Sequence, residues 1–249
     1  RLVACLEGDW RPSWRVDLFP DYKLNRLDET GAEEEPDNLG PQIPILLDVL
    51  DALGIPMVGV DDYEADDLMA TFSVKQNGPI RIVTGDRDLF QLVDDNRDVK
   101  VVYLAKGISK HDLVDLSWIE DKYEIPGDRY SLFAMIRGDS SDGLPGIRGI
   151  GEKGAATIAN QFKSLPEVMT AAQSGDERLT PNLRKKLLES SDYALIAPKL
   201  VGCALDVAIP EMSIELPIKP KSLAKITRLK EEFGLGASID RIMAALGWI

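Results

Sequence analysis

Three short clusters of carboxylates constrain this chain more than any other feature of its sequence. They are Glu64, Asp66 and Asp67; Asp86 and Asp88; and Asp139 and Asp142. Each cluster follows a predicted strand at the start of a helix, or lies on a short loop. Carboxylates packed closely repel one another, so gathering them costs free energy unless a cation neutralises them. The sequence therefore predicts a fold that collects acids around metal ions.

The chemistry of these ligands indicates which metal they would hold. Oxygen donors without thiolate or imidazole partners favour Mg²⁺ or Mn²⁺. Two such ions about 4 Å apart promote in-line attack on a phosphodiester. The one histidine, His111, lies in a polar stretch, which argues against zinc or histidine-base chemistry. A single acid is more often a plain surface residue, but three clusters together favour a metal site.

Length, cysteine content and charge exclude several classes of protein. A chain of 249 residues suffices for one large domain or a domain with an appendage. Cys5 and Cys203 are interpreted as reduced thiols of a cytoplasmic protein, and no membrane span or signal peptide is expected. A net charge of −13 argues against a general nucleic-acid coat protein. Part of that charge falls in the acidic run 28–37, which we expect to be a solvated loop.

Hydrophobic patterns predict strands that alternate with helices in the first half of the chain. Strands are expected at 2–6, 55–60, 80–84 and 99–104, and helices at 42–53, 64–74 and 87–93. This order predicts an α/β fold with a mostly parallel twisted sheet flanked by helices. Functional groups collect at the carboxyl ends of such strands. We therefore expect Glu64, Asp86 and Asp88 at one edge of the sheet.

The second half of the chain is predicted to be helical. Helices are expected at 118–123, 129–136 and 155–162, with a break around 207–220. The expected organisation is an α/β core at 1–115, a helical region at 116–205, and a C-terminal segment at 206–249 that packs back on the core.

A glycine-rich hairpin is the second chemical feature. Its glycines permit close backbone approach, the following helix N-terminus presents free N–H groups, and its two basic residues add positive charge. The residues concerned are Gly146, Arg148, Gly149, Gly151 and Lys153. Glycine spacing alone is equally consistent with a tight turn between packed helices. The position directly after Asp139 and Asp142 favours contact with a nucleic-acid backbone.

A basic and aromatic segment at 9–26 is the third feature. Arg15, Lys23 and Arg26 are candidates to neutralise a scissile phosphate, and Tyr22 is a candidate to stack on a base. Periodicity alone favours a solvated loop with a few buried aromatic rings.

Three blocks of sequence resemble the 5′ nuclease family. They are 63–68 (YEADDL), 84–92 (TGDRDLFQL) and 137–153 (RGDSSDGLPGIRGIGEK). That family includes flap endonucleases and bacterial 5′–3′ exonucleases such as the N-terminal domain of DNA polymerase I. The resemblance runs from about residue 2 to 162. The segment 22–26 is similar to the family's arginine- and lysine-bearing segment near the scissile phosphate.

The resemblance implies a PIN-like nuclease fold with a helical arch and a helix-three-turn-helix DNA clamp, often holding K⁺. It implies that Glu64 and Asp66 bind a first divalent ion, and that Asp86, Asp88 and Asp142 bind a second. Asp67 and Asp139 would act through water. The implied enzyme is a monomeric 5′–3′ exonuclease and flap endonuclease of bacterial replication and repair, associated with the nucleoid. Its DNA substrates would be 5′ flaps, gaps and recessed 5′ ends.

The chain also departs from the family pattern. The family's first aspartate has no aspartate counterpart, which we attribute to residues missing upstream of Arg1. The family's Phe-Asp pair aligns best with Leu6-Glu7, so Glu7 is a candidate ligand, and Asp9 competes with it. Gly143 replaces an asparagine of the family motif. The linker between Arg26 and Gln42 is short and acidic, so a long basic arch is not expected.

Two other functions stay open from the sequence. One is a non-catalytic DNA-junction-binding module with a degenerate metal site, which the substitution at Glu7 would support. Another is an RNA-cleaving nuclease, against which the duplex-binding hairpin argues. We expect a free-standing enzyme because the chain shows no polymerase segment.

Overall fold

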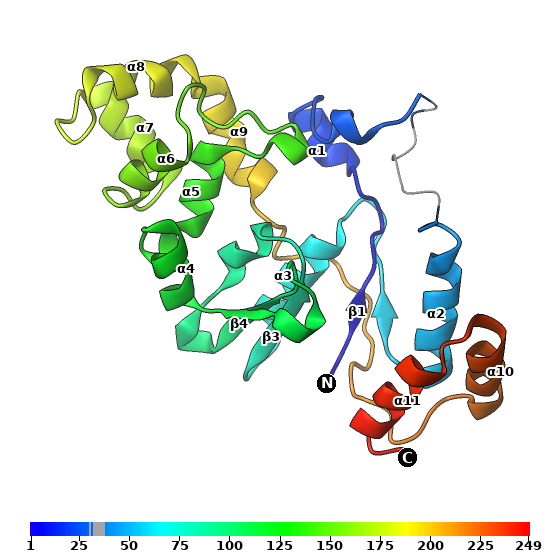
Figure 1. Cartoon of the computed structure of the whole chain (residues 1–249). Coiled ribbons are helices and arrows are strands. Elements are labelled where there is room, and N and C mark those ends of the chain that lie inside the picture. Colours follow the sequence, from blue (N-terminus) through cyan, green and yellow to red (C-terminus); the bar gives the residue numbers. More distant parts are fainter. Residues whose placement is uncertain (30, 32–37) are drawn as a thin grey trace.

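A computed structural model describes residues 1–29, 31 and 38–249 of the chain (Figure 1). Most of the acidic run predicted to be a solvated loop, 28–37, lies outside the described residues. The part that is described has the mixed α/β architecture predicted from the sequence. None of its helices is both long enough and apolar enough to cross a bilayer.

The strands of the first half form two small sheets. Strand β1 (Ala4–Cys5) pairs in parallel with β2 (Met57–Val58). Strand β3 (Ile80–Thr84) pairs in parallel with β4 (Val99–Tyr103), and β5 (Asp112–Val114) joins β4 in antiparallel orientation. The sequence predicted a single sheet, and β5 was missed because it lies in the polar stretch 109–115 without a run of apolar residues. In the described chain the parallel pairs still point their carboxyl ends toward the acidic clusters.

Helices of the first half follow the predicted pattern where their apolar spacing is regular. Helix α2 (Gln42–Leu53) has the predicted bounds and ends at Gly54, whose φ of 79° suits a glycine C-cap. Helix α3 (Ala65–Lys75) starts directly after Glu64, and a short 3₁₀ helix occupies Asp88–Leu92. The segment 9–26, predicted as a loop, contains helix α1 (Ser13–Leu18) and a 3₁₀ turn at Leu24–Arg26. Neither element is long enough to show a helical period.

The second half is a helical unit that shares its core with the sheet. Its elements are α4 (Leu116–Tyr123), α5 (Tyr130–Arg137), α6 (Glu152–Ala159), α7 (Leu165–Ser174), α8 (Pro181–Glu189) and α9 (Ser191–Val201). Phe90 after β3 packs edge-on against Trp118 of α4 and Tyr130 of α5. One buried cluster therefore runs from the strands through the helices and holds the loop between α5 and α6 beside the sheet.

The C-terminal segment returns to the first half of the chain. No helix or strand occurs between α9 and α10 (Leu223–Phe233), and α11 (Gly236–Ala245) follows. Both helices pack on α2 in a second buried cluster that includes Leu53, Leu229 and Ile239. Figure 1 shows α10 and α11 beside α2, far from α6 to α9.

Candidate active site

Carboxylates from four segments of the chain line one pocket beside the carboxyl ends of β1 and β3. They come from the segment after β1, the start of α3, the turn after β3 and the loop after α5. The acids concerned are Glu7, Glu64, Asp66, Asp86, Asp88 and Asp142. An adjoining hollow is lined by Asp86, Asp88, Asp139 and Asp142. The structure therefore brings together the three clusters that are separated in the sequence.

Two of these acids have strongly raised pKa values. Burial, and then the negative charges of Asp86, Glu64 and Glu7, raise the pKa of Asp66 to about 8. Burial, and then Asp86, Asp139 and Asp142, raise the pKa of Asp88 to about 7. Shifts of this kind mean that neighbouring cations do not balance the charge at these two side chains. A bound cation would relieve that repulsion.

Other acids of the pocket are already paired with basic residues. Glu64 is buried, and its Oε1 accepts a hydrogen bond from Tyr22 Oη at 2.8 Å and forms an ion pair with Lys23 Nζ at 3.0 Å. Burial raises the pKa of Glu64, and Lys23 opposes that effect. Arg26 forms an ion pair with Asp142. Lys23 and Arg26 thus lie beside the carboxylates, while Tyr22 is buried and offers no exposed ring for a base in this conformation.

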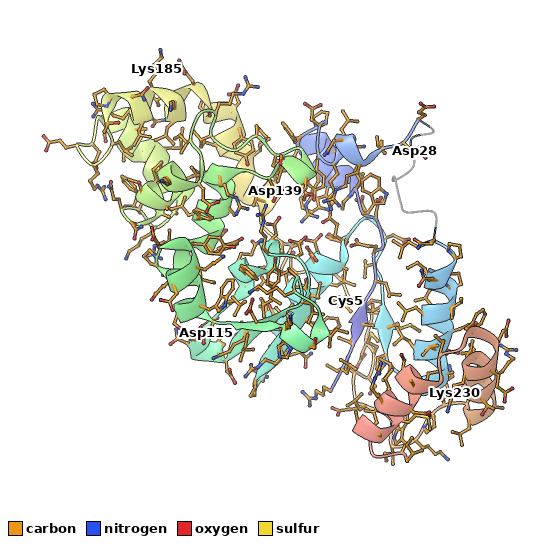
Figure 2. All side chains as sticks on the ribbon, viewed as in Figure 1. Cys5, Asp28, Asp115, Asp139, Lys185 and Lys230 are labelled. Atoms are coloured by element: carbon orange, nitrogen blue, oxygen red, sulfur yellow. The ribbon has the colours of Figure 1, made fainter. Side chains whose placement is uncertain are left out.

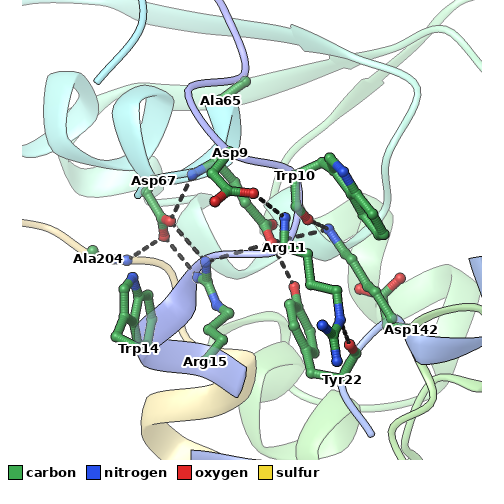
Figure 3. Close-up of polar contacts among 12 residues, drawn as sticks. Asp9, Trp10, Arg11, Trp14, Arg15, Tyr22, Ala65, Asp67, Asp142 and Ala204 are labelled. Carbon is green, nitrogen blue, oxygen red and sulfur yellow. Dashed lines mark hydrogen bonds and ion pairs between the residues drawn. The ribbon is translucent and has the colours of Figure 1, made fainter. Parts of the chain in front are cut away.

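Arg15 and Asp67 form a buried pair at the wall of the pocket, and Arg15 itself lines the pocket (Figure 3). Both terminal nitrogens of Arg15 donate to Asp67, at 2.7 and 2.8 Å. Asp67 Oδ1 also accepts the backbone N–H of Ala204 at 2.7 Å. With only 4% and 0% of their side chains exposed, these two residues hold α1 against α3. Arg15 also lies 3.6 Å from Oε1 of Glu64, so it adds positive charge to the pocket as well as supporting the fold.

The structure separates the two candidates that follow β1. Glu7 lines the carboxylate pocket, and its Oε2 accepts the N–H of Ala65 at the start of α3. Asp9 is instead turned to its own loop, where Oδ1 accepts the N–H of Arg11 at 2.9 Å (Figure 3). Glu7 therefore occupies the position that a ligand at the end of this strand would need.

Asp139 is balanced by two arginines that the sequence did not single out. Arg87 donates to Asp139 Oδ2 at 2.7 Å, and Arg137 lies 3.8 Å from the same oxygen. Burial raises the pKa of Asp139, but hydrogen bonds from Ser141 and Arg87 outweigh burial and lower it to about 2. Both arginines adjoin the acidic blocks, yet only the fold shows that they face Asp139.

The glycine hairpin follows this loop and leads into α6. Gly138 and Gly146 are packed so closely that a Cβ on Gly146 would lie 2.6 Å from the N of Gly138. Arg148 and Lys153 are exposed, and Gly151 is the N-cap of α6. Helix α6 begins earlier than predicted because Glu152 and Lys153 already have helical geometry. The predicted hairpin is therefore a tight, exposed turn next to the acidic pocket.

The donor set of the pocket fits hard divalent cations. All six acids supply oxygen ligands. Burial and neighbouring carboxylates raise the pKa values of Asp66 and Asp88, and a bound cation would counter both effects. Within residues 1–29, 31 and 38–249, no three acidic, cysteine or histidine side chains converge closely enough to enclose one ion as they stand. Carboxylates now paired with Lys23 and Arg26 would have to turn toward the metal.

An α/β fold with an acidic pocket beside its strand ends is the arrangement that a metal-dependent phosphodiesterase needs. Comparison with known proteins defines the family. Residues 1–124 match the model of the 5′-3′ exonuclease N-terminal resolvase-like domain, and residues 125–224 match that of the 5′-3′ exonuclease C-terminal SAM fold. The chain belongs to the 5′–3′ exonuclease family and is a 5′ nuclease. The resemblance found in the sequence is thereby confirmed.

Two curated relatives support the same family assignment, and two solved structures share the fold. A 5′-3′ exonuclease of Streptomyces coelicolor is 47% identical over 98% of this chain and 83% of the relative. A DNA polymerase I of Mycobacterium bovis is 33% identical over 95% of this chain but only 25% of its own length. Among solved structures, zinc-bound T5 5′-exonuclease gives a TM-score of 0.62 at 20% identity, covering 81% of this chain and 73% of that one. The Rad2 catalytic core with DNA gives 0.54 at 16% identity, over 98% and 78%.

Proposed function

We propose that this chain hydrolyses DNA at 5′ flaps, gaps and recessed 5′ ends with the help of Mg²⁺ or Mn²⁺. The observation that carries the proposal is the pocket in which Asp66 and Asp88, whose pKa values are raised to about 8 and about 7, lie with Glu7 and Asp86. Solved relatives in fold, T5 flap endonuclease and the Rad2 core, were determined with DNA, and the former with metal ions.

The acids divide into a set that would hold metal and a set that supports the fold. Glu7, Glu64 and Asp66 would hold one ion, and Asp86, Asp88 and Asp142 another. Bound divalent ions would supply an acidified water and stabilise the leaving oxygen. Asp139 stays paired with Arg87 and keeps the loop after α5 in place. Asp67 stays paired with Arg15, which lines the same pocket and also pairs with Glu64 at 3.6 Å.

Lys23 and Arg26 are the basic residues placed to act on the substrate. Each is paired with a pocket carboxylate, Glu64 or Asp142. When a metal ion neutralises that carboxylate, Lys23 or Arg26 is freed from its ion pair. It can then neutralise the negative charge on the phosphate oxygens in the same pocket. The exposed hairpin with Arg148 and Lys153 would hold the duplex arm through its backbone. The regions 1–115, 116–205 and 206–249 would then serve as catalytic core, duplex clamp and structural support.

Cleavage of a 5′-flap DNA in Mn²⁺ tests the proposal, with Asp86→Asn beside the wild type. The matched control is Asp121→Asn, which removes the same charge from an exposed position on α4. We expect the wild type and Asp121→Asn to cut near the junction, and Asp86→Asn to lose cleavage by a factor on the order of 10² or more. Flap binding without cleavage by the wild type would instead indicate a junction-binding module. Equal cleavage of a matched RNA flap would contradict DNA specificity.

A further inference from the structure

Two hydrogen bonds tie the glycine hairpin to the end of helix α8. Lys186 Nζ donates to the backbone carbonyl of Gly149 at 2.6 Å. The N–H of Arg148 donates to Oγ of Ser190, the C-cap of α8, at 3.3 Å. The end of α8 thus binds two consecutive hairpin residues, Arg148 through its N–H and Gly149 through its carbonyl.

The Lys186 side chain packs closely against the backbone of Gly149. Gly149 has a φ of 75°, and a Cβ there would lie 3.3 Å from Lys186 Cε. Ser190 is buried, and its own N–H donates to the carbonyls of Lys186 and Leu187. These hydrogen bonds fix the end of α8. They therefore also fix the backbone position from which the Lys186 side chain extends to the hairpin.

We propose that Lys186 supplies the hairpin with an internal cation in place of the K⁺ that the family resemblance implies. An ammonium carries the same charge as K⁺, and its charged hydrogen bond to a carbonyl is stronger than a neutral one. The Lys186 ammonium would repel a second cation at the Gly149 carbonyl oxygen, so the surroundings of that oxygen do not fit K⁺. Lys186 is a positioning residue that sets the backbone of the turn, and the turn contacts DNA. The inference rests on the proposed role of the hairpin as a duplex clamp.

Duplex binding is the first test, measured by fluorescence anisotropy without divalent metal so that no cleavage occurs. KCl is compared with choline chloride at equal ionic strength, because total salt alone changes affinity for DNA. We expect the wild type to bind equally in both. Lys186→Met should lose about tenfold or more in choline chloride and regain most of it in KCl, since K⁺ can fill the vacated place.

Lys185→Met is the matched control, because it removes the same charge from the neighbouring position. Its side chain is 72% exposed and makes only a 3.8 Å pair with Glu189, and Figure 2 shows it at the outer edge of the helical region. Any loss of affinity in this variant should be the same in both salts. Wild-type binding that requires K⁺ would overturn the inference. So would a Lys186→Met variant that behaves like Lys185→Met.

Hydrogen exchange of the hairpin amides supplies a readout that needs no DNA. In Lys186→Met these amides should exchange faster than in the wild type in choline chloride, and KCl should restore protection. Thermal melting of each variant checks that the fold is intact. If the wild type binds no duplex while K⁺ still protects the Lys186→Met hairpin, the clamp function fails and the cation inference stands. If the wild type binds duplex while K⁺ has no effect on Lys186→Met, the clamp function stands and the cation inference fails.

Discussion

Arg15 of α1 donates to both carboxylate oxygens of Asp67 in α3, and both residues are buried. The guanidinium also stacks on the ring of Trp14, 4.2 Å from its centroid. Because Asp67 accepts the N–H of Ala204 as well, one carboxylate joins three segments that are distant in sequence. The pair therefore fixes one wall of the candidate active site, which Arg15 itself lines.

Replacement of Asp67 by asparagine should destabilise the protein strongly, because it leaves the buried charge of Arg15 with only the longer ion pair to Glu64, at 3.6 Å. Loss of one partner of a buried pair costs about 3–5 kcal/mol of unfolding free energy. Urea unfolding measures this value. The control is Asp98→Asn, which breaks an exposed pair with Arg81 and should cost less than about 1 kcal/mol. Similar small losses for both variants would show that the Arg15–Asp67 pair is not a structural support.

Glu7 and Asp9 should differ sharply in their effect on cleavage. Glu7→Gln removes a charge from the carboxylate pocket, and we expect the cleavage rate to fall on the order of 10²-fold. Asp9→Asn alters a hydrogen bond within its own loop and should leave the rate within about threefold. Single-turnover cleavage of the 5′ flap measures both. A larger effect at Asp9 would reverse the assignment of the ligand after β1.

Local sequence was sufficient to predict the elements of the fold that depend on interactions between residues close together in the chain. The apolar spacing of 42–53 and the glycine at 54 predicted α2 with its bounds. Because these acids follow predicted parallel strands, the sequence predicted Glu64, Asp86 and Asp88 at one edge of the sheet. One pocket contains all three. The first inference needs only the helical spacing of apolar residues and a glycine cap. The second needs only the common direction of parallel strands.

Long-range contacts account for what the sequence did not reveal. Arg15 looked like an exposed phosphate contact, but its partner Asp67 lies on another helix and buries it. Arg87 stands inside an acidic block, and only folding places it on Asp139. Lys186 lies far along the chain from Gly149, and no local pattern connects them. A basic residue's partner determines its role, and that partner is set by tertiary structure.

The metal-free protein should become less stable as pH rises from about 4 to about 8. Asp66 and Asp88 have folded pKa values of about 8 and about 7 against a reference of 3.8. Across that interval the folded chain binds protons that the unfolded chain has released, so the unfolding free energy falls with pH. Below pH 4 both states are protonated at these sites and the contribution is fully present.

Urea unfolding in EDTA at several pH values measures this dependence. Asp66→Asn should flatten it, because the amide does not ionise. Added Mg²⁺ should stabilise the protein most at the high-pH end, where the carboxylates are charged and free to bind it. A pH-independent unfolding free energy in EDTA would contradict the clustering of acids described for this pocket.

The C-terminal segment should contribute to the stability of the first half of the chain through Leu229. This side chain is 2% exposed in the cluster of α2, α10 and α11. Leu229→Ala should cost about 2–5 kcal/mol by removing buried contacts and leaving a cavity. Leu223→Ala changes the same residue type on the same helix, but at 60% exposure, and should stay within about 0.5 kcal/mol. If 206–249 packs as part of the core, Leu229→Ala lowers the midpoint of a single urea transition. A separate early transition, with flap cleavage unaffected, would show instead that α10 and α11 form an independent unit.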